Sequence, residues 1–116
     1  MKKVILSAAL VAASLSIVAF KSMEEKTATI VVNIEVQDFA TFKKSFDAGA
    51  PIREKGGIKV IGLYQSVDNP NTVTVVEEAA SGESAKAFFA NPKTKEAMQN
   101  SGVISKPDVR ILNKVQ

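Results

Sequence analysis

Hydrophobic and polar residues alternate in four short runs of this chain. In residues 28–36 one face of an extended chain is wholly apolar and the other is mixed. Comparable alternation occurs in residues 58–66, 72–78 and 108–115. The pattern predicts four strands. The turn sequence DNPN at residues 68–71 joins the second strand to the third as a hairpin.

Helical spacing follows the first of these runs. Phe39, Phe42 and Phe46 recur at i, i+3 and i+7, which places them on one face of a helix. Asp38 stands where an N-cap residue belongs, because its carboxylate can accept a bond from the first turn. Pro51 has no N–H to donate, so we expect a break before it and one more helical turn after it.

Caps and stops define the remaining helical parts. The glycine pair at residues 56–57 should end the turn that Pro51 begins. Ser81 can cap a second helix, and Asn91 with Pro92 indicates a fresh start within it. Gly102 then ends this second helical region.

The order strand, helix, strand, strand, helix, strand predicts an α+β fold, a ferredoxin-like βαββαβ sandwich with a four-stranded antiparallel sheet, in residues 29–116. Helices would cover one sheet face. We expect the other face to carry Val31 together with Leu63, Val73 and Val75. An apolar face of that size favours a partner, and we predict a homodimer.

The first residues have the layout of an export signal. Lys2 and Lys3 precede an apolar run at residues 4–20, so we assign residues 1–22 as a signal peptide and residues 23–28 as a tether. The protein would then be exported, periplasmic or secreted. A membrane anchor formed by the same segment is the alternative, since its length approaches that of a spanning helix, and a core helix is a third interpretation.

Charge and composition exclude several classes of function. The formal net charge is +3, but without its first 22 residues the chain is neutral, so nucleic acid is not an expected partner. The chain has no cysteine and no histidine. This removes thiolate nucleophiles, the commonest general base and the commonest metal ligand, and we predict no metal site. Chemistry would depend on carboxylates, amides, hydroxyls or Tyr64.

Four segments carry a resemblance to a known group: VQDFATFKKSFDAGAPIREKGGIK, YQSVDNPNTVTVVEE, AKAFFANPKTKEAM and SGVISKPDV. They are similar to small dimeric α/β-barrel proteins of the antibiotic-biosynthesis-monooxygenase-like type. The resemblance implies that two sheets pack face to face as a dimeric α/β barrel, with a pocket between sheet and helices in each protomer. It also implies no cofactor, because characterised monooxygenases of this superfamily use neither metal nor flavin and activate oxygen through a bound aromatic substrate.

Three positions depart from that group. Relatives often carry histidine where this chain has Ile34 and Gly49, and tryptophan where it has Phe42. The resemblance therefore implies a more apolar pocket here, and a histidine-dependent role does not transfer.

Two polar side chains are candidates for the ligand pocket. The phenol of Tyr64 could orient or deprotonate an aromatic substrate, but we favour a barrel or core tyrosine whose hydroxyl finds a partner at the edge. Asn33 could hold a carbonyl group, or it could bond to neighbouring backbone or face the dimer seam.

Three further candidates lie on the first helical region. Arg53 could clamp an anionic group, or pair at the surface with a nearby acid. Phe42 and Phe46 could line the ligand cavity or simply form core. For Lys59 and Glu77 we expect an ion pair across the hairpin rather than a catalytic role.

The sequence leaves three functions open. The first is an exported, dimeric barrel protein that binds a small apolar or aromatic molecule, with no catalytic residue assigned. The second is a cofactor-independent monooxygenase of the antibiotic-biosynthesis type. The third is a non-catalytic structural or interaction dimer.

Overall fold

A computed structural model describes residues 26–116, so the predicted signal peptide and half of the predicted tether, residues 23–25, lie outside the described residues. The sheet is antiparallel and four-stranded, in the order β2-β3-β1-β4. Its strands are β1 (Ala28–Glu35), β2 (Lys59–Gln65), β3 (Thr72–Ala79) and β4 (Asp108–Asn113). The predicted ferredoxin-like α+β fold is confirmed.

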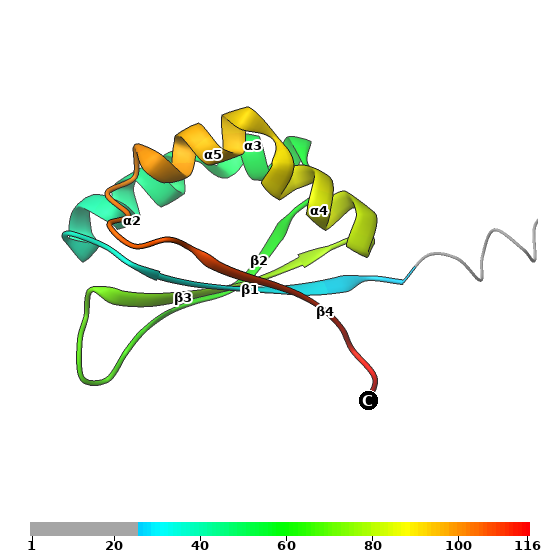
Figure 1. Ribbon diagram of the computed structural model, residues 1–116, viewed down its shortest axis with the longest axis horizontal. Helices are drawn as coiled ribbons and strands as arrows, with labels where there is room; N and C mark the ends of the chain where they lie inside the picture. The colour runs from blue at the N-terminus through cyan, green and yellow to red at the C-terminus, as the bar shows by residue number, and fades with distance from the viewer. Residues whose placement is uncertain (1–25) are drawn as a thin grey trace, which may run out of the picture.

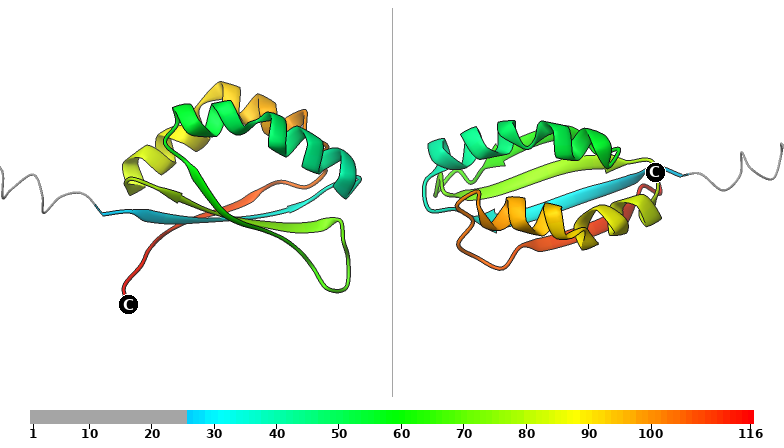
Figure 2. Two further views of the ribbon diagram at one scale, coloured as in Figure 1. Left: turned by 180° about the vertical axis from the view of Figure 1, so that it is seen from behind. Right: turned by 90° about the horizontal axis from the view of Figure 1, so that it is seen from above.

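Each of the two helical regions consists of two helices. They are α2 (Phe39–Ala48) with α3 (Ala50–Lys55), and α4 (Gly82–Ala90) with α5 (Pro92–Gln99). All four arch over the same side of the sheet (Figure 1). Seen from above, they form two rows that run roughly along the strands (Figure 2). Within residues 26–116, none of the helices has the length and apolar character needed to cross a membrane.

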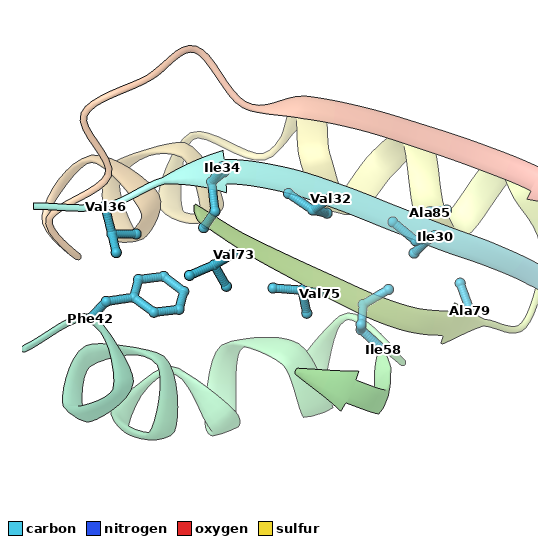
Figure 3. Close-up of a cluster of buried hydrophobic side chains, with 10 residues drawn as sticks. All are labelled: Ile30, Val32, Ile34, Val36, Phe42, Ile58, Val73, Val75, Ala79 and Ala85. Atoms are coloured by element: carbon cyan, nitrogen blue, oxygen red, sulfur yellow. The ribbon is translucent and has the colours of Figure 1, made fainter. Parts of the chain in front are cut away.

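The core follows from how the two central strands pair. Val32 lies opposite Val75 and Ile34 opposite Val73, and opposed residues of antiparallel strands point to the same face. These side chains are at most 4% exposed. Phe42 of α2 closes the layer from the helix side, at 3% exposed (Figure 3).

The helices begin where the sequence predicts. The carboxylate of Asp38 accepts bonds from the Thr41 backbone N–H at 2.9 Å and the Thr41 hydroxyl at 2.8 Å. These bonds lower the pKa of Asp38. Ser81 and Ser84 form a capping box at α4, and Asn91 caps α5, each through backbone donors of the first turn.

The end of α3 explains the glycine pair. The Ile58 N–H donates to the Arg53 carbonyl at 2.9 Å, and the Gly57 N–H donates to the Glu54 carbonyl at 3.1 Å, which is a Schellman motif. Gly57 has φ of +72°, a conformation that glycine adopts without steric cost. Ile58 is then buried at 6% exposed, so the turn is tied to the core.

We define the open face as the side of the sheet opposite the helices. The register places on it the following residues of β1, β3, β4 and β2: Thr29, Val31, Asn33, Glu35, Thr72, Thr74, Val76, Glu78, Asp108, Arg110, Leu112, Lys59, Gly62 and Tyr64. Val31 is there, as expected. The expectation for Val73, Val75 and Leu63 is wrong: the first two are buried in the core and Leu63 packs against it.

Phe42 and Phe46 differ in burial, so their truncations should differ in cost. Phe42→Ala should lower the free energy of unfolding by about 3–5 kcal/mol, because the ring is fully enclosed. Phe46→Ala should cost less, since Phe46 is only partly buried. Urea denaturation followed by circular dichroism measures both. A larger loss for Phe46→Ala than for Phe42→Ala would contradict the packing described.

Candidate functional site

A cavity of about 100 Å³ lies between the helices and the covered side of the sheet. Its walls come from β1, β3, all four helices and the segment after α5. Most of the lining is apolar, which suits the body of a small organic molecule. The lining residues are Val32, Ile34, Phe42, Ser45, Phe46, Gly49, Ile52, Arg53, Val75, Glu77, Phe88, Phe89, Thr94, Ala97, Met98, Ser101 and Val103.

Aromatic rings form two walls of the cavity. Phe42 and Phe46 on α2 have ring centroids 5.8 Å apart and are inclined at 34°. Phe88 and Phe89 on α4 meet edge to face, with centroids 5.1 Å apart at 86°. Tilted and edge-to-face contacts of this kind are favourable for aromatic pairs. A flat apolar guest would therefore meet rings from both helical rows.

Arg53 brings a positive charge to this apolar space. Its guanidinium carbon lies 4.0 Å from the centre of the Phe46 ring, in a cation–π contact. A β-carbon at Gly49 would come 3.2 Å from Arg53 Nη1, so the glycine gives the guanidinium room. Burial lowers the pKa of Arg53 while Glu77 raises it. An arginine nevertheless stays protonated at neutral pH.

Glu77 is the buried acid of the site. It follows Val73 and Val75 at two-residue intervals on β3, so its side chain points under the helices and is only 4% exposed. The ion pairs found among residues 26–116 are Lys43–Asp47 and Arg110–Asp108, so no cation bonds directly to the Glu77 carboxyl there. Burial raises the pKa of Glu77 above its usual 4.5, and the charge of Arg53 only partly offsets this.

Three hydroxyl side chains complete the polar part of the lining, those of Ser45, Thr94 and Ser101, and the last two are buried. Ser101 donates to the Met98 carbonyl at 2.6 Å, so its hydrogen is already used. Thr94 on α5 is 4% exposed, and its Oγ1 has no hydrogen-bond partner in the part of the chain that the structure describes. An unpaired buried hydroxyl costs free energy, and such groups call for an explanation.

The predicted site residues fall on two sides of the sheet. Phe42, Phe46 and Arg53 all line the cavity. Asn33 and Tyr64 lie on the open face, away from it. There Asn33 Oδ1 accepts a 2.6 Å hydrogen bond from Thr74 Oγ1. Tyr64 is 55% exposed.

Glu77 is the residue that sequence reasoning misplaced. The expected pairing with Lys59 is wrong, because Lys59 lies opposite Glu78 and Glu77 lies opposite Val60 and Ile30. The signal that could have found it is the alternation of TVTVVEE, in which Glu77 shares a face with Val73 and Val75. Taking those valines as core would have placed the carboxyl there too.

Three positions where the sequence departs from the pattern of the group it resembles all line the cavity: Ile34, Phe42 and Gly49. None of them contributes a polar side chain. The ionisable groups of the lining are instead Arg53 and Glu77. Among residues 26–116, no three acidic side chains gather where a metal ion could be held.

Comparison with solved structures supports the fold. A candidate antibiotic biosynthesis monooxygenase from Bordetella bronchiseptica aligns with a TM-score of 0.67 at 18% identity, over 78% of this chain and 99% of the other. A second candidate of that kind, from Caulobacter crescentus, has a TM-score of 0.63 at 22% identity, over 79% and 92%. SnoaB, a cofactor-independent oxygenase from Streptomyces nogalater, has a TM-score of 0.64 at 15% identity, over 78% and 95%.

At these identities the likeness is one of fold. No protein-family model matches the sequence. A search of curated proteins gives no match either.

The buried carboxyl predicts a pH dependence. Unfolded, Glu77 loses its proton near its usual pKa of 4.5, whereas the folded protein keeps that proton to higher pH. The contribution of Glu77 to stability is therefore present below pH 4.5 and is lost as pH rises through the folded pKa. Glu77→Gln should remove this loss. The free energy of unfolding of the variant should therefore increase relative to that of the wild type as the pH rises.

Urea denaturation of both proteins from about pH 4 to about pH 8 measures the difference. Comparing variants cancels other groups, such as Asp38, whose lowered pKa acts in the opposite direction. The control is Glu96→Gln, which changes an exposed carboxylate on α5. If both variants follow the wild-type curve, the Glu77 carboxyl is not buried as described.

Proposed function

We propose that this protein binds a small, mainly apolar or aromatic molecule in the cavity between its sheet and its helices. The observation that carries this proposal is the Glu77 carboxyl, which faces an apolar cavity and has no direct ion pair among the described residues. Among the described residues only Thr94 Oγ1 is both fully enclosed and unpaired, so the oxygens of Glu77 keep some exposure to the cavity. A carboxyl whose pKa is raised by burial is typical of a functional site. A ligand that bonds to it would supply the missing partner.

The size of the cavity limits the ligand. An apolar cavity of about 150 Å³ is large enough to hold benzene. At about 100 Å³ this cavity is smaller than that one, so it can enclose at most a single ring and excludes a polycyclic molecule. The rings of Phe46 and Phe89 add flat apolar surface on which such a ring can pack.

Export and dimerisation belong to the same proposal. The open face carries Val31, Val76 and Leu112 among polar residues, and the last is 46% exposed. Burying these side chains against a second copy would remove apolar area from water. The signal peptide proposed from residues 1–22 would place this dimer outside the cytoplasm.

A cofactor-independent monooxygenase is the second candidate function. It is favoured by the fold likeness to SnoaB, which is described as a cofactor-independent oxygenase. In this reading Glu77 acts as the base that accepts the hydroxyl proton of a bound hydroquinone, since its raised pKa makes it a better acceptor than an exposed carboxylate.

Blocking the cavity tests the proposed function. Ligand-detected NMR with toluene and phenol should show binding to the full chain. Ala97→Leu, which adds bulk to the lining, should abolish it, whereas Ala87→Leu, at an exposed position of α4, should not. Oxygen uptake with a set of hydroquinones then separates catalysis from binding, because only the monooxygenase consumes oxygen and loses this activity in Glu77→Gln. Equal binding by both alanine variants would contradict the cavity as the site.

Light scattering tests the dimer. The full chain should have twice the mass of one protomer at micromolar concentration. Val76→Asp places a charge on the open face and should give monomers, because a buried unpaired charge is strongly unfavourable. Val67→Asp, at a fully exposed loop position, is the matched control. A monomeric wild type would contradict the proposed assembly.

A further inference from the structure

Two opposite charges line the cavity without forming a direct ion pair. The direct ion pairs within 4.0 Å among residues 26–116 are Lys43–Asp47 and Arg110–Asp108, so Arg53 and Glu77 stand farther apart than that limit. Each still acts on the charge of the other across the cavity. The space between them is therefore bounded by a hydrogen-bond acceptor on β3 and a set of donors on α3.

The charges restrict what can occupy this space. An anionic ligand would bond to Arg53 but be repelled by Glu77. A cationic ligand would bond to Glu77 but be repelled by Arg53. A hydrocarbon would displace water from both groups and offer neither of them a bond. An uncharged group with a donor beside an acceptor can satisfy both ends together.

A carboxamide has this arrangement. Its N–H can donate to the Glu77 carboxylate, and its carbonyl oxygen can accept from the Arg53 guanidinium. Bonds to charged groups are the stronger kind, and they are stronger still away from water. The remainder of the cavity, walled by phenylalanines, then holds an apolar ring.

We propose that the ligand of this cavity is an uncharged single-ring carboxamide or lactam, oriented by Glu77 and Arg53. The inference rests on the proposed function and adds its chemical class. Glu77 and Arg53 are thus the residues that determine specificity. Thr94, whose hydroxyl is unpaired on the same lining, offers a further donor for the carbonyl oxygen.

Four probes of similar size test this class. Calorimetric titration of the full chain at about pH 8, well above the usual range of carboxyl pKa values, compares benzamide, toluene, benzoate and benzamidine. Benzamide should bind about tenfold to a hundredfold more tightly than toluene, which is the usual contribution of bonds to charged groups. Both charged probes should bind more weakly than benzamide.

Variants that remove one charge should shift the preference in opposite directions. Glu77→Gln keeps the shape of the side chain but leaves Arg53 as the one charged group among the described residues of the cavity lining. The affinity for benzoate should therefore rise relative to that for benzamide, and the affinity for benzamidine should fall. Arg53→Met leaves Glu77 as the one charged group of the described lining, so the affinity for benzamidine should rise relative to that for benzamide. Glu96→Gln and Arg110→Gln, which change exposed groups outside the cavity, should keep the wild-type order. Because the two cavity variants predict opposite shifts, either one tests the inference if the other does not fold.

The results separate this inference from the proposed function. If toluene binds as tightly as benzamide, or if the cavity variants keep the wild-type order, the ligand class is wrong while binding in the cavity stands. If the folded wild type binds none of the four probes, the proposed function falls and the inference falls with it. Benzamide preference together with opposite charge shifts supports both.

Discussion

The pairing of β1 with β3 is the constraint on which the rest of the structure depends. Side chains alternate along a strand, so Val73 and Val75 cannot point into the core unless Glu77 does as well. Releasing the carboxyl by a slip of one residue would turn the valines out into water. The same hydrogen-bonded ladder that forms the core therefore holds an ionisable group between the layers.

Most of the fold was predictable because its signals are local. Asp38, Ser81 and Asn91 cap helices through contacts within three residues, and the glycine pair at residues 56–57 closes α3 within one turn. Alternation within each strand is also a local signal. These features need no knowledge of which strand lies beside which.

The site was harder to predict because it depends on register. In residues 72–78 each face of the strand mixes apolar and acidic residues, because Val73 and Val75 share one face with Glu77 and Val76 shares the other with Glu78. The prediction that Val73 and Val75 face outward is wrong, and so is the predicted pairing of Glu77 with Lys59. Only the pairing with β1, about forty residues away in sequence, decides the question. Arg53 was easier to find, because the helix break at Pro51 marks its place.

The open face has a spectroscopic consequence. The chain has one tyrosine and no tryptophan, and that tyrosine lies over Gly62, where a β-carbon would come 2.5 Å from its hydroxyl oxygen. Ultraviolet emission of the folded chain thus originates almost wholly from Tyr64, on the side of the sheet away from the cavity. The protein therefore has a built-in fluorophore on the open face, which would respond to any partner that covers this face and does not contact the cavity under the helices.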